Sequence, residues 1–114
     1  VSLARAAREE LAESEGAAAR TRWVAASVGP YGATLHDGSE YRGDDGLSED
    51  ALVAFHQPRV DALLGAGPDL LACETLPSLR EARAILRVLN AYPKARAWVS
   101  FTCRDGSSTC AGDA

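Results

Sequence analysis

Short apolar runs alternate with amphipathic helical segments along this chain of 114 residues. Residues 23–28, 69–74 and 97–103 form the apolar runs, and a segment with helical periodicity precedes each of them. Strands and helices that alternate in this way build parallel sheets, because each right-handed crossover returns the chain to the same edge. The pattern predicts an α/β fold with three parallel strands adjacent in chain order, as in an open three-layer sheet or part of a (β/α)8 barrel.

Apolar spacing and capping residues predict the first two helices. The first covers residues 2–14, and the second begins after the N-cap Ser48 and ends near residue 66. Pro58 falls inside the second helix, where the carbonyl of Ala54 loses its hydrogen-bond donor. We therefore expect this helix to be kinked or interrupted there. Its predicted apolar face contains Leu52, Phe55, Val60, Leu63 and Leu64.

The third helix is predicted to begin after Ser78. Ser78 and Glu81 have the spacing of a capping box, in which each side chain bonds the backbone amide of the other residue. The predicted apolar stripe of this helix is Leu79, Ala82, Ile85, Leu86 and Leu89. The predicted solvent side carries Arg80, Glu81, Arg83 and Arg87.

Glu74 is the residue that this order of elements marks for function. It directly follows four apolar residues, Leu70 to Cys73, and precedes a loop that leads into the third helix. The carboxyl ends of parallel strands are where α/β folds bind their ligands. Position alone leaves a second interpretation open, in which Glu74 only hydrogen-bonds the neighbouring loop.

A long polar loop follows the first strand. Gly29, Pro30 and Gly32 end that strand, and a segment rich in Gly, Asp and Ser continues to Leu47. Loops of this length in compact folds are usually functional, although a mobile surface excursion has the same composition. Both interpretations stay open.

Composition and charge exclude several classes of protein. The formal net charge is −4, with 12 basic and 16 acidic residues and no basic cluster, so we expect no nucleic-acid partner. The apolar runs are too short to span a bilayer. The first residues are charged too early for a signal peptide, so we expect a cytoplasmic protein.

The cysteines and histidines do not have the spacing of a metal site. Cys73, Cys103 and Cys110 are an odd number without a Cys-x-x-Cys pair, and His36 and His56 lie far apart. Cys73 falls in an apolar run and is predicted to be a buried thiol. No metal ligand is therefore expected among these residues.

Several blocks of sequence carry a resemblance to a known family. They are residues 24–33 (VAASVGPYGA), 55–59 (FHQPR), 70–78 (LLACETLPS) and 98–106 (WVSFTCRDG). In this order and spacing they resemble the homocysteine S-methyltransferases, most closely the enzymes that use S-methylmethionine, which are related to betaine–homocysteine methyltransferase. The likeness runs from about residue 3 to residue 113.

The resemblance implies a zinc-dependent (β/α)8 TIM barrel. Residues 1–114 correspond to about its third to fifth strands with their helices, so the chain is expected to be an internal fragment of the barrel domain. Family members bind zinc through three cysteine thiolates, in a Gly-Val-Asn-Cys and a Gly-Gly-Cys-Cys segment. This sequence contains neither segment. The resemblance therefore implies zinc in the complete enzyme, with no ligand among Cys73, Cys103 and Cys110.

The resemblance also implies a reaction and its substrate residues. The family transfers a methyl group from a sulfonium donor, S-methylmethionine or S-adenosylmethionine, to homocysteine, and so forms methionine. Glu74 matches the strand-end glutamate that receives the substrate ammonium group. Ser27, Tyr31 and Ser100 lie at strand ends nearby and are further candidates, unless they only satisfy loop backbone groups. No catalytic residue is assigned, the oligomeric state is open, and a truncated, inactive barrel fragment is the alternative.

Overall fold

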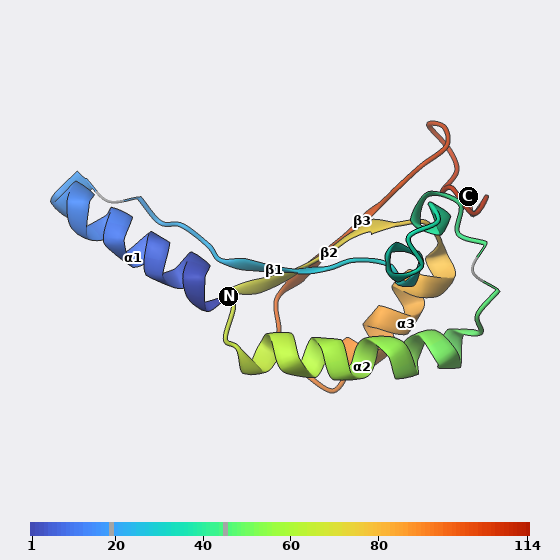
Figure 1. Ribbon diagram of the computed structural model, residues 1–114, viewed down its shortest axis with the longest axis horizontal. Coiled ribbons are helices and arrows are strands. Elements are labelled where there is room, and N and C mark those ends of the chain that lie inside the picture. The colour runs from blue at the N-terminus through green and yellow to red at the C-terminus, as the bar shows by residue number, and fades with distance from the viewer. Residues whose placement is uncertain (19, 45) are drawn as a thin grey trace.

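The computed structural model describes residues 1–18, 20–44 and 46–114, which form an open α/β layer structure (Figure 1). Its helices and strands are α1 (Ser2–Glu15), β1 (Ala25–Val28), α2 (Glu49–Gly65), β2 (Leu70–Leu76), α3 (Leu79–Leu89) and β3 (Ala97–Phe101). Three short 3₁₀ helices complete the described part: η1 (Gly16–Ala18), η2 (Tyr31–Thr34) and η3 (Ser39–Tyr41). Among these helices, none is both long and apolar enough to cross a membrane.

The three strands form one parallel sheet in the order β1-β2-β3. Ser27 of β1 lies beside Ala72 of the central strand, and Ala72 lies beside Trp98 of β3. This arrangement confirms the predicted fold class and the predicted adjacency in chain order. It is also what right-handed crossovers through α2 and α3 require.

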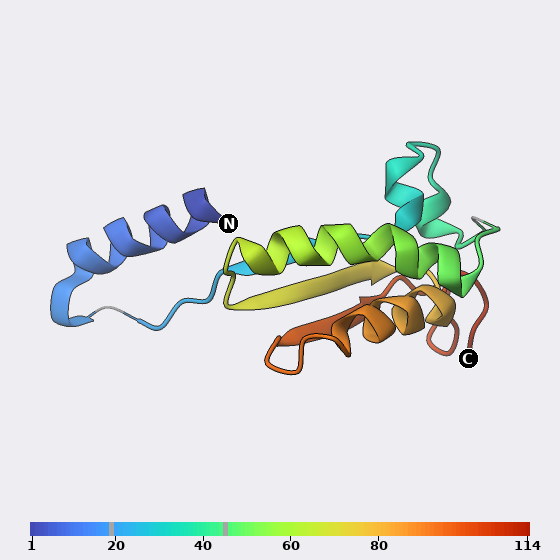
Figure 2. The same ribbon diagram turned by 90° about the horizontal axis from the view of Figure 1, so that it is seen from below.

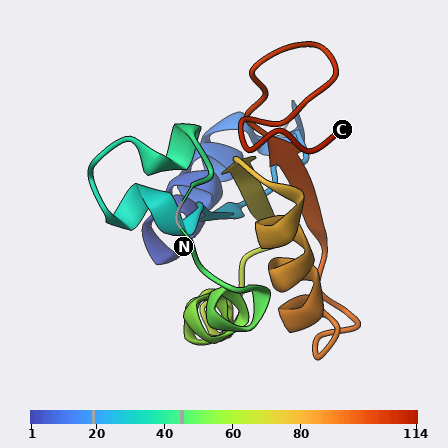
Figure 3. The ribbon, with the colours of Figure 1, turned by 90° about the vertical axis from the view of Figure 1, so that its right-hand side faces the viewer.

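Helices α2 and α3 cover one face of the sheet only (Figures 2 and 3). Alternate residues of the strands enter the core with residues of both helices, among them Ala26, Val28, Leu71, Cys73, Val60, Ile85 and Val88. The residues between them face the other way, and Ser27 and Ser100 are exposed there. Successive strand residues point to opposite faces, so the uncovered face carries its own set of side chains.

Helix α1 lies apart from this core. None of its residues is buried, and Figure 1 shows it extending beyond the amino-terminal end of the sheet. An ion pair ties α1 to the sheet, because a guanidinium nitrogen of Arg8 lies 2.6 Å from the Asp69 carboxylate. The same carboxylate accepts a hydrogen bond from the amide of Val24 at 2.6 Å, and this bond is the main reason why the pKa of Asp69 is lowered.

Helix α3 is rotated relative to the predicted stripe. Glu81, predicted on the solvent side, is fully buried, whereas Leu86, predicted in the stripe, is 50% exposed. The buried side contains Glu81, Ile85 and Val88, which recur at i, i+4 and i+7. The prediction placed Leu86 on the buried side of α3 because it is hydrophobic, and Glu81 on the solvent side because it is acidic. The sequence does not reveal that Glu81 has a buried hydrogen-bond partner in another helix.

The sequence predicted the start of helix α2 correctly, but not its course through Pro58. Its start is as predicted, since Ser48 is the N-cap and its hydroxyl accepts a hydrogen bond from the amide of Ala51 at 3.2 Å. Of the two alternatives expected at Pro58, the interruption is wrong, because the helix runs through Pro58 as one element, whereas the kink stays a prediction. Pro58 and Ala54 are both exposed, so water can hydrate the carbonyl that the proline leaves without a donor.

Candidate functional site

A β-bulge shapes the carboxyl end of β2. Cys73 pairs with Val99 and Leu76 pairs with Phe101, so Glu74 and Thr75 lie opposite the single residue Ser100. Thr75 has a φ of 64°, which is unusual for a β-branched residue. The extra residue returns Leu76 to the buried side and leaves Glu74 on the uncovered face. Bulges and unusual φ angles of this kind concentrate next to functional sites.

The Glu74 carboxylate meets a hydroxyl from the neighbouring strand. Ser27 of β1 donates a hydrogen bond to Oε1 of Glu74 at 3.0 Å. Within the described ranges, no cationic side chain forms an ion pair with Glu74. The arrangement is a half-buried carboxylate that is oriented on one oxygen and has no positive partner of its own.

The other two sequence-predicted site residues occupy different places. Ser100 lies across the bulge from Glu74 and is exposed, so the structure brings Ser27, Glu74 and Ser100 to adjacent strand ends. Tyr31 instead contacts the helical layer. Its ring packs edge-on against Phe55 of α2, with the ring centroids 5.0 Å apart. None of these positions tests a substrate contact, which stays a prediction for all four residues.

The segment after β3 holds the start of α3 in place. Asp113 accepts a hydrogen bond from the amide of Leu79 at 2.7 Å, and Ser78 accepts one from the amide of Glu81 at 3.2 Å. These two bonds satisfy amides that a helix amino terminus leaves free, and the Asp113 carboxylate suits the positive end of the helix dipole. The exit of β2 towards α3 is thereby fixed just beyond Glu74.

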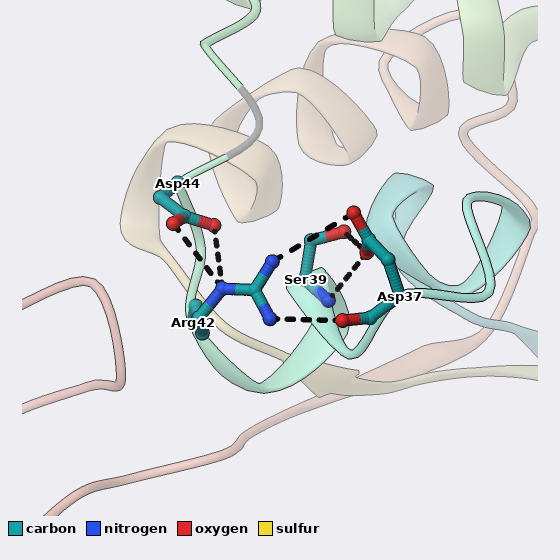
Figure 4. A network of polar contacts seen from close by, with 4 residues as sticks. All are labelled: Asp37, Ser39, Arg42 and Asp44. Carbon is teal, nitrogen blue, oxygen red and sulfur yellow. Dashed lines mark hydrogen bonds and ion pairs between the residues drawn. The ribbon is translucent and has the colours of Figure 1, made fainter.

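The polar loop after β1 has an ordered internal network (Figure 4). The Asp37 carboxylate accepts hydrogen bonds from both the amide and the hydroxyl of Ser39. Arg42 donates to the carbonyl of Asp37 at 3.0 Å and to the Asp44 carboxylate at 3.2 Å. Both hydrogen bonds from Ser39 lower the pKa of Asp37, and the bond from the hydroxyl has the larger effect. The described part of the loop therefore holds its own shape through local polar bonds.

Gly32 allows the turn after β1 to approach this loop closely. A Cβ atom built on Gly32 would lie 2.5 Å from the backbone nitrogen of Glu40 and 2.6 Å from the carbonyl carbon of Ser39. A Cβ atom on Gly29, three residues earlier, would meet no atom within 4 Å. Of these two glycines, only Gly32 lies where a side chain cannot enter unless the backbone moves.

We expect Gly32→Ala to destabilise the folded protein by about 1–3 kcal/mol, since backbone must move to admit the methyl group. Gly29→Ala is the matched control and should change the free energy of unfolding by less than about 0.5 kcal/mol. Urea unfolding followed by circular dichroism measures both. Equal stability of the two variants would show that the turn and the loop do not pack as described.

The three cysteines lie in different environments. Burial, and to a lesser degree the nearby charge of Glu74, raises the pKa of the Cys73 thiol to about 11. Cys73 points into the core, whereas Cys103 is exposed and Cys110 is half-buried. Across residues 1–18, 20–44 and 46–114, no three His, Cys, Asp or Glu side chains are placed to hold a metal ion.

Thiol labelling should separate the cysteines in the folded protein. Cys103 should react first with a disulfide reagent at neutral pH, whereas Cys73 should react only on unfolding, because a buried thiol with a pKa of about 11 has almost no thiolate. Mass spectrometry of the labelled peptides assigns each site. Rapid labelling of Cys73 without denaturant would contradict its burial.

His56 and Glu81 form a polar pair in the core that was not predicted from the sequence. Oε1 of Glu81 lies 2.8 Å from Nε2 of His56, and both side chains are fully buried. The same oxygen accepts a hydrogen bond from the amide of Tyr31 at 2.6 Å. Helical spacing offered a signal, since His56 falls four residues from both Leu52 and Val60, which are buried.

The layering and the site define a segment of a (β/α)8 barrel, with helices outside and a carboxylate at the strand ends on the uncovered face. The sequence matches the family model for homocysteine S-methyltransferase over residues 1–114, and the chain therefore belongs to that family.

Relatives and solved structures agree with this assignment. Homocysteine S-methyltransferase from Escherichia coli is 62% identical over 105 residues, which are 92% of this chain and 34% of that protein. Betaine-homocysteine S-methyltransferase from Drosophila melanogaster is 43% identical over 118 residues, or 99% of this chain and 36% of that protein. The metallated crystal structure of the E. coli homocysteine methyltransferase MmuM gives a TM-score of 0.93 at 58% identity and covers 99% of this chain and 39% of that one.

The chain thus spans about a third of the length of the curated relatives it matches. The family and the barrel segment follow from these matches.

Proposed function

We propose that this chain forms the homocysteine-binding segment of a homocysteine S-methyltransferase. The observation that carries the proposal is the carboxylate of Glu74 near the strand ends, which Ser27 orients and which has no cationic partner among the described residues, in a chain that belongs to this family. In the reaction, the homocysteine sulfur attacks the methyl carbon of a sulfonium donor, S-methylmethionine or S-adenosylmethionine. A new sulfur–carbon bond forms as the donor's sulfur–methyl bond breaks, which gives methionine and a neutral sulfide.

Glu74 is assigned to the ammonium group of homocysteine. Ser27 occupies Oε1, and Oε2 is then free to accept a charge-assisted hydrogen bond from the ligand. Ser100 lies across the bulge, where its hydroxyl can contact the same amino acid, and Tyr31 follows the end of β1. Methyl transfer needs little proton transfer at carbon, so binding and orientation are the tasks that these residues perform.

Zinc is part of the proposal for the complete enzyme and not for these residues. The donor sets of the described residues do not fit a metal ion, and the Cys73 thiol is protonated at neutral pH. The zinc-binding thiolates implied by the family resemblance belong to Gly-Val-Asn-Cys and Gly-Gly-Cys-Cys segments outside this sequence. Bound zinc would favour the thiolate form of homocysteine, which is the nucleophile.

A hybrid enzyme provides the test of Glu74. In it, residues 1–114 replace the matching third of the E. coli relative, which is 62% identical over 105 of them. Glu74→Gln keeps the side-chain size and removes the charge. We expect a loss of about 1.5–3 kcal/mol, or roughly ten- to hundred-fold weaker homocysteine binding by calorimetric titration, with unchanged zinc content.

Glu49→Gln is the matched control, since Glu49 pairs with Arg87 on the outer helices and lies in α2. It should leave homocysteine affinity unchanged. If Glu74 has only a structural role, Glu74→Gln should lower the melting temperature and leave affinity as it was. That outcome would remove Glu74 from the substrate site.

Residues 1–114 on their own should neither bind zinc tightly nor form methionine, because they lack the cysteine segments that the family resemblance implies. Metal analysis after dialysis and a methionine-formation assay measure the two properties. Stoichiometric zinc or measurable turnover would contradict the prediction. A hybrid that folds but binds no homocysteine would instead favour the inactive-fragment alternative.

A further inference from the structure

Glu81 joins three separate elements through one carboxylate oxygen. It lies in the first turn of α3, and Oε1 is 2.8 Å from Nε2 of His56 in α2. The same Oε1 accepts the amide hydrogen of Tyr31, the first residue of η2, at 2.6 Å. Each bond reaches across the fold, since Glu81 is 25 residues from His56 and 50 from Tyr31.

This carboxylate does not perform the capping function that its spacing suggested. Ser78 accepts the amide of Glu81, which is one half of a capping box. The Glu81 side chain is turned instead to the segment after β1, where it satisfies an amide that the start of η2 leaves free. Its position is therefore set by long-range contacts and not by the local helix.

The pair is kept in the core although it is not fully satisfied. Both side chains have no exposed surface, and within residues 1–18, 20–44 and 46–114 neither Nδ1 of His56 nor Oε2 of Glu81 has a hydrogen-bond partner. Buried polar atoms without partners are rare because their desolvation is costly. An apolar pair of similar volume would fill the same space without this cost, but it could not hold the Tyr31 amide.

We propose that Glu81, held by His56, is a positioning residue that fixes the turn after β1 and thereby the Ser27–Glu74 pair for homocysteine. The proposal rests on the proposed function of Glu74. Tyr31 follows Ser27 by four residues, and β1 ends between them at Val28. Holding the Tyr31 amide thus anchors the exit of the strand that carries Ser27, whose hydroxyl orients the Glu74 carboxylate.

Replacing Tyr31 with proline tests the contribution of the single backbone amide that donates a hydrogen bond to Glu81. Proline has no N–H, and it is favoured at the first position of a helix, which Tyr31 occupies in η2. Pro30 has φ −69° and ψ 160°, the extended geometry that a residue before proline prefers. Tyr31→Pro should therefore fit the backbone. Tyr31→Ala is the matched control, because it also lacks the tyrosine ring but keeps the amide.

The hybrid enzyme decides between positioning and a purely structural role. We expect the KM for homocysteine to be roughly tenfold higher in Tyr31→Pro than in Tyr31→Ala, with kcat at saturating homocysteine within about twofold. Glu81→Leu, which has a similar size but no acceptor oxygen for the Tyr31 amide, should also raise the KM. The double variant Glu81→Leu/Tyr31→Pro should be no worse than Tyr31→Pro alone, because both changes remove the same bond. A lower melting temperature with equal KM values in all variants would overturn the proposal.

Hydrogen exchange tests the positioning role of Glu81 independently of the substrate role proposed for Glu74. Amides of residues 29 and 31–34 should exchange faster in Glu81→Leu, which has no acceptor for the Tyr31 amide, than in the control Glu49→Leu, whether or not the hybrid binds homocysteine. Unchanged exchange there refutes the positioning role. A hybrid that shows the exchange effect but binds no homocysteine refutes the substrate assignment and leaves the anchoring of the turn intact.

Discussion

The central strand β2 determines how the rest of the described chain is arranged, because it pairs with β1 on one edge and β3 on the other. Its bulge decides which side chains face the helices and which face away. Without the extra residue at Thr75, Leu76 would point to the uncovered face and the core would lose a fully buried leucine. The burial of Leu76, and with it part of the hydrophobic layer, therefore depends on one local change of register just after Glu74.

The loops at the carboxyl ends of the strands are held by polar groups of the helices. The amino terminus of α3 binds Asp113 from the last segment, and Glu81 binds the Tyr31 amide from the turn after β1. Gly32 then lets the polar loop pack against that turn at a distance that excludes a side chain. Hydrogen bonds and one close backbone contact thus fix the neighbourhood of Glu74, where apolar packing alone would leave the loops loosely placed.

Regular features were predictable from the sequence, and irregular ones were not. Alternating apolar runs predicted the parallel sheet, and capping rules predicted Ser48 as the N-cap of α2. Glu74, predicted to end its strand, lies inside β2, which continues through the bulge to Leu76. Glu81 was placed on the wrong side of α3 because its partner lies 25 residues away in another helix. The bulge at Thr75 had no signal either, since its positive φ falls on a residue type that rarely adopts it.

Cys73 and Glu74 are neighbours in the sequence, but the fold places them in opposite environments. Cys73 and Glu74 are adjacent in β2, and the alternation of the strand sends them to opposite faces. The core side buries the Cys73 thiol and raises its pKa, so a nucleophilic sulfur is suppressed beside the site. On the open side, the Glu74 carboxylate has a hydroxyl partner in Ser27 and no cationic partner in the part of the chain that the structure describes. The proposed role of Glu74 follows from this contrast, because a carboxylate without a cationic partner among the described residues can accept a charge-assisted hydrogen bond from a ligand ammonium group.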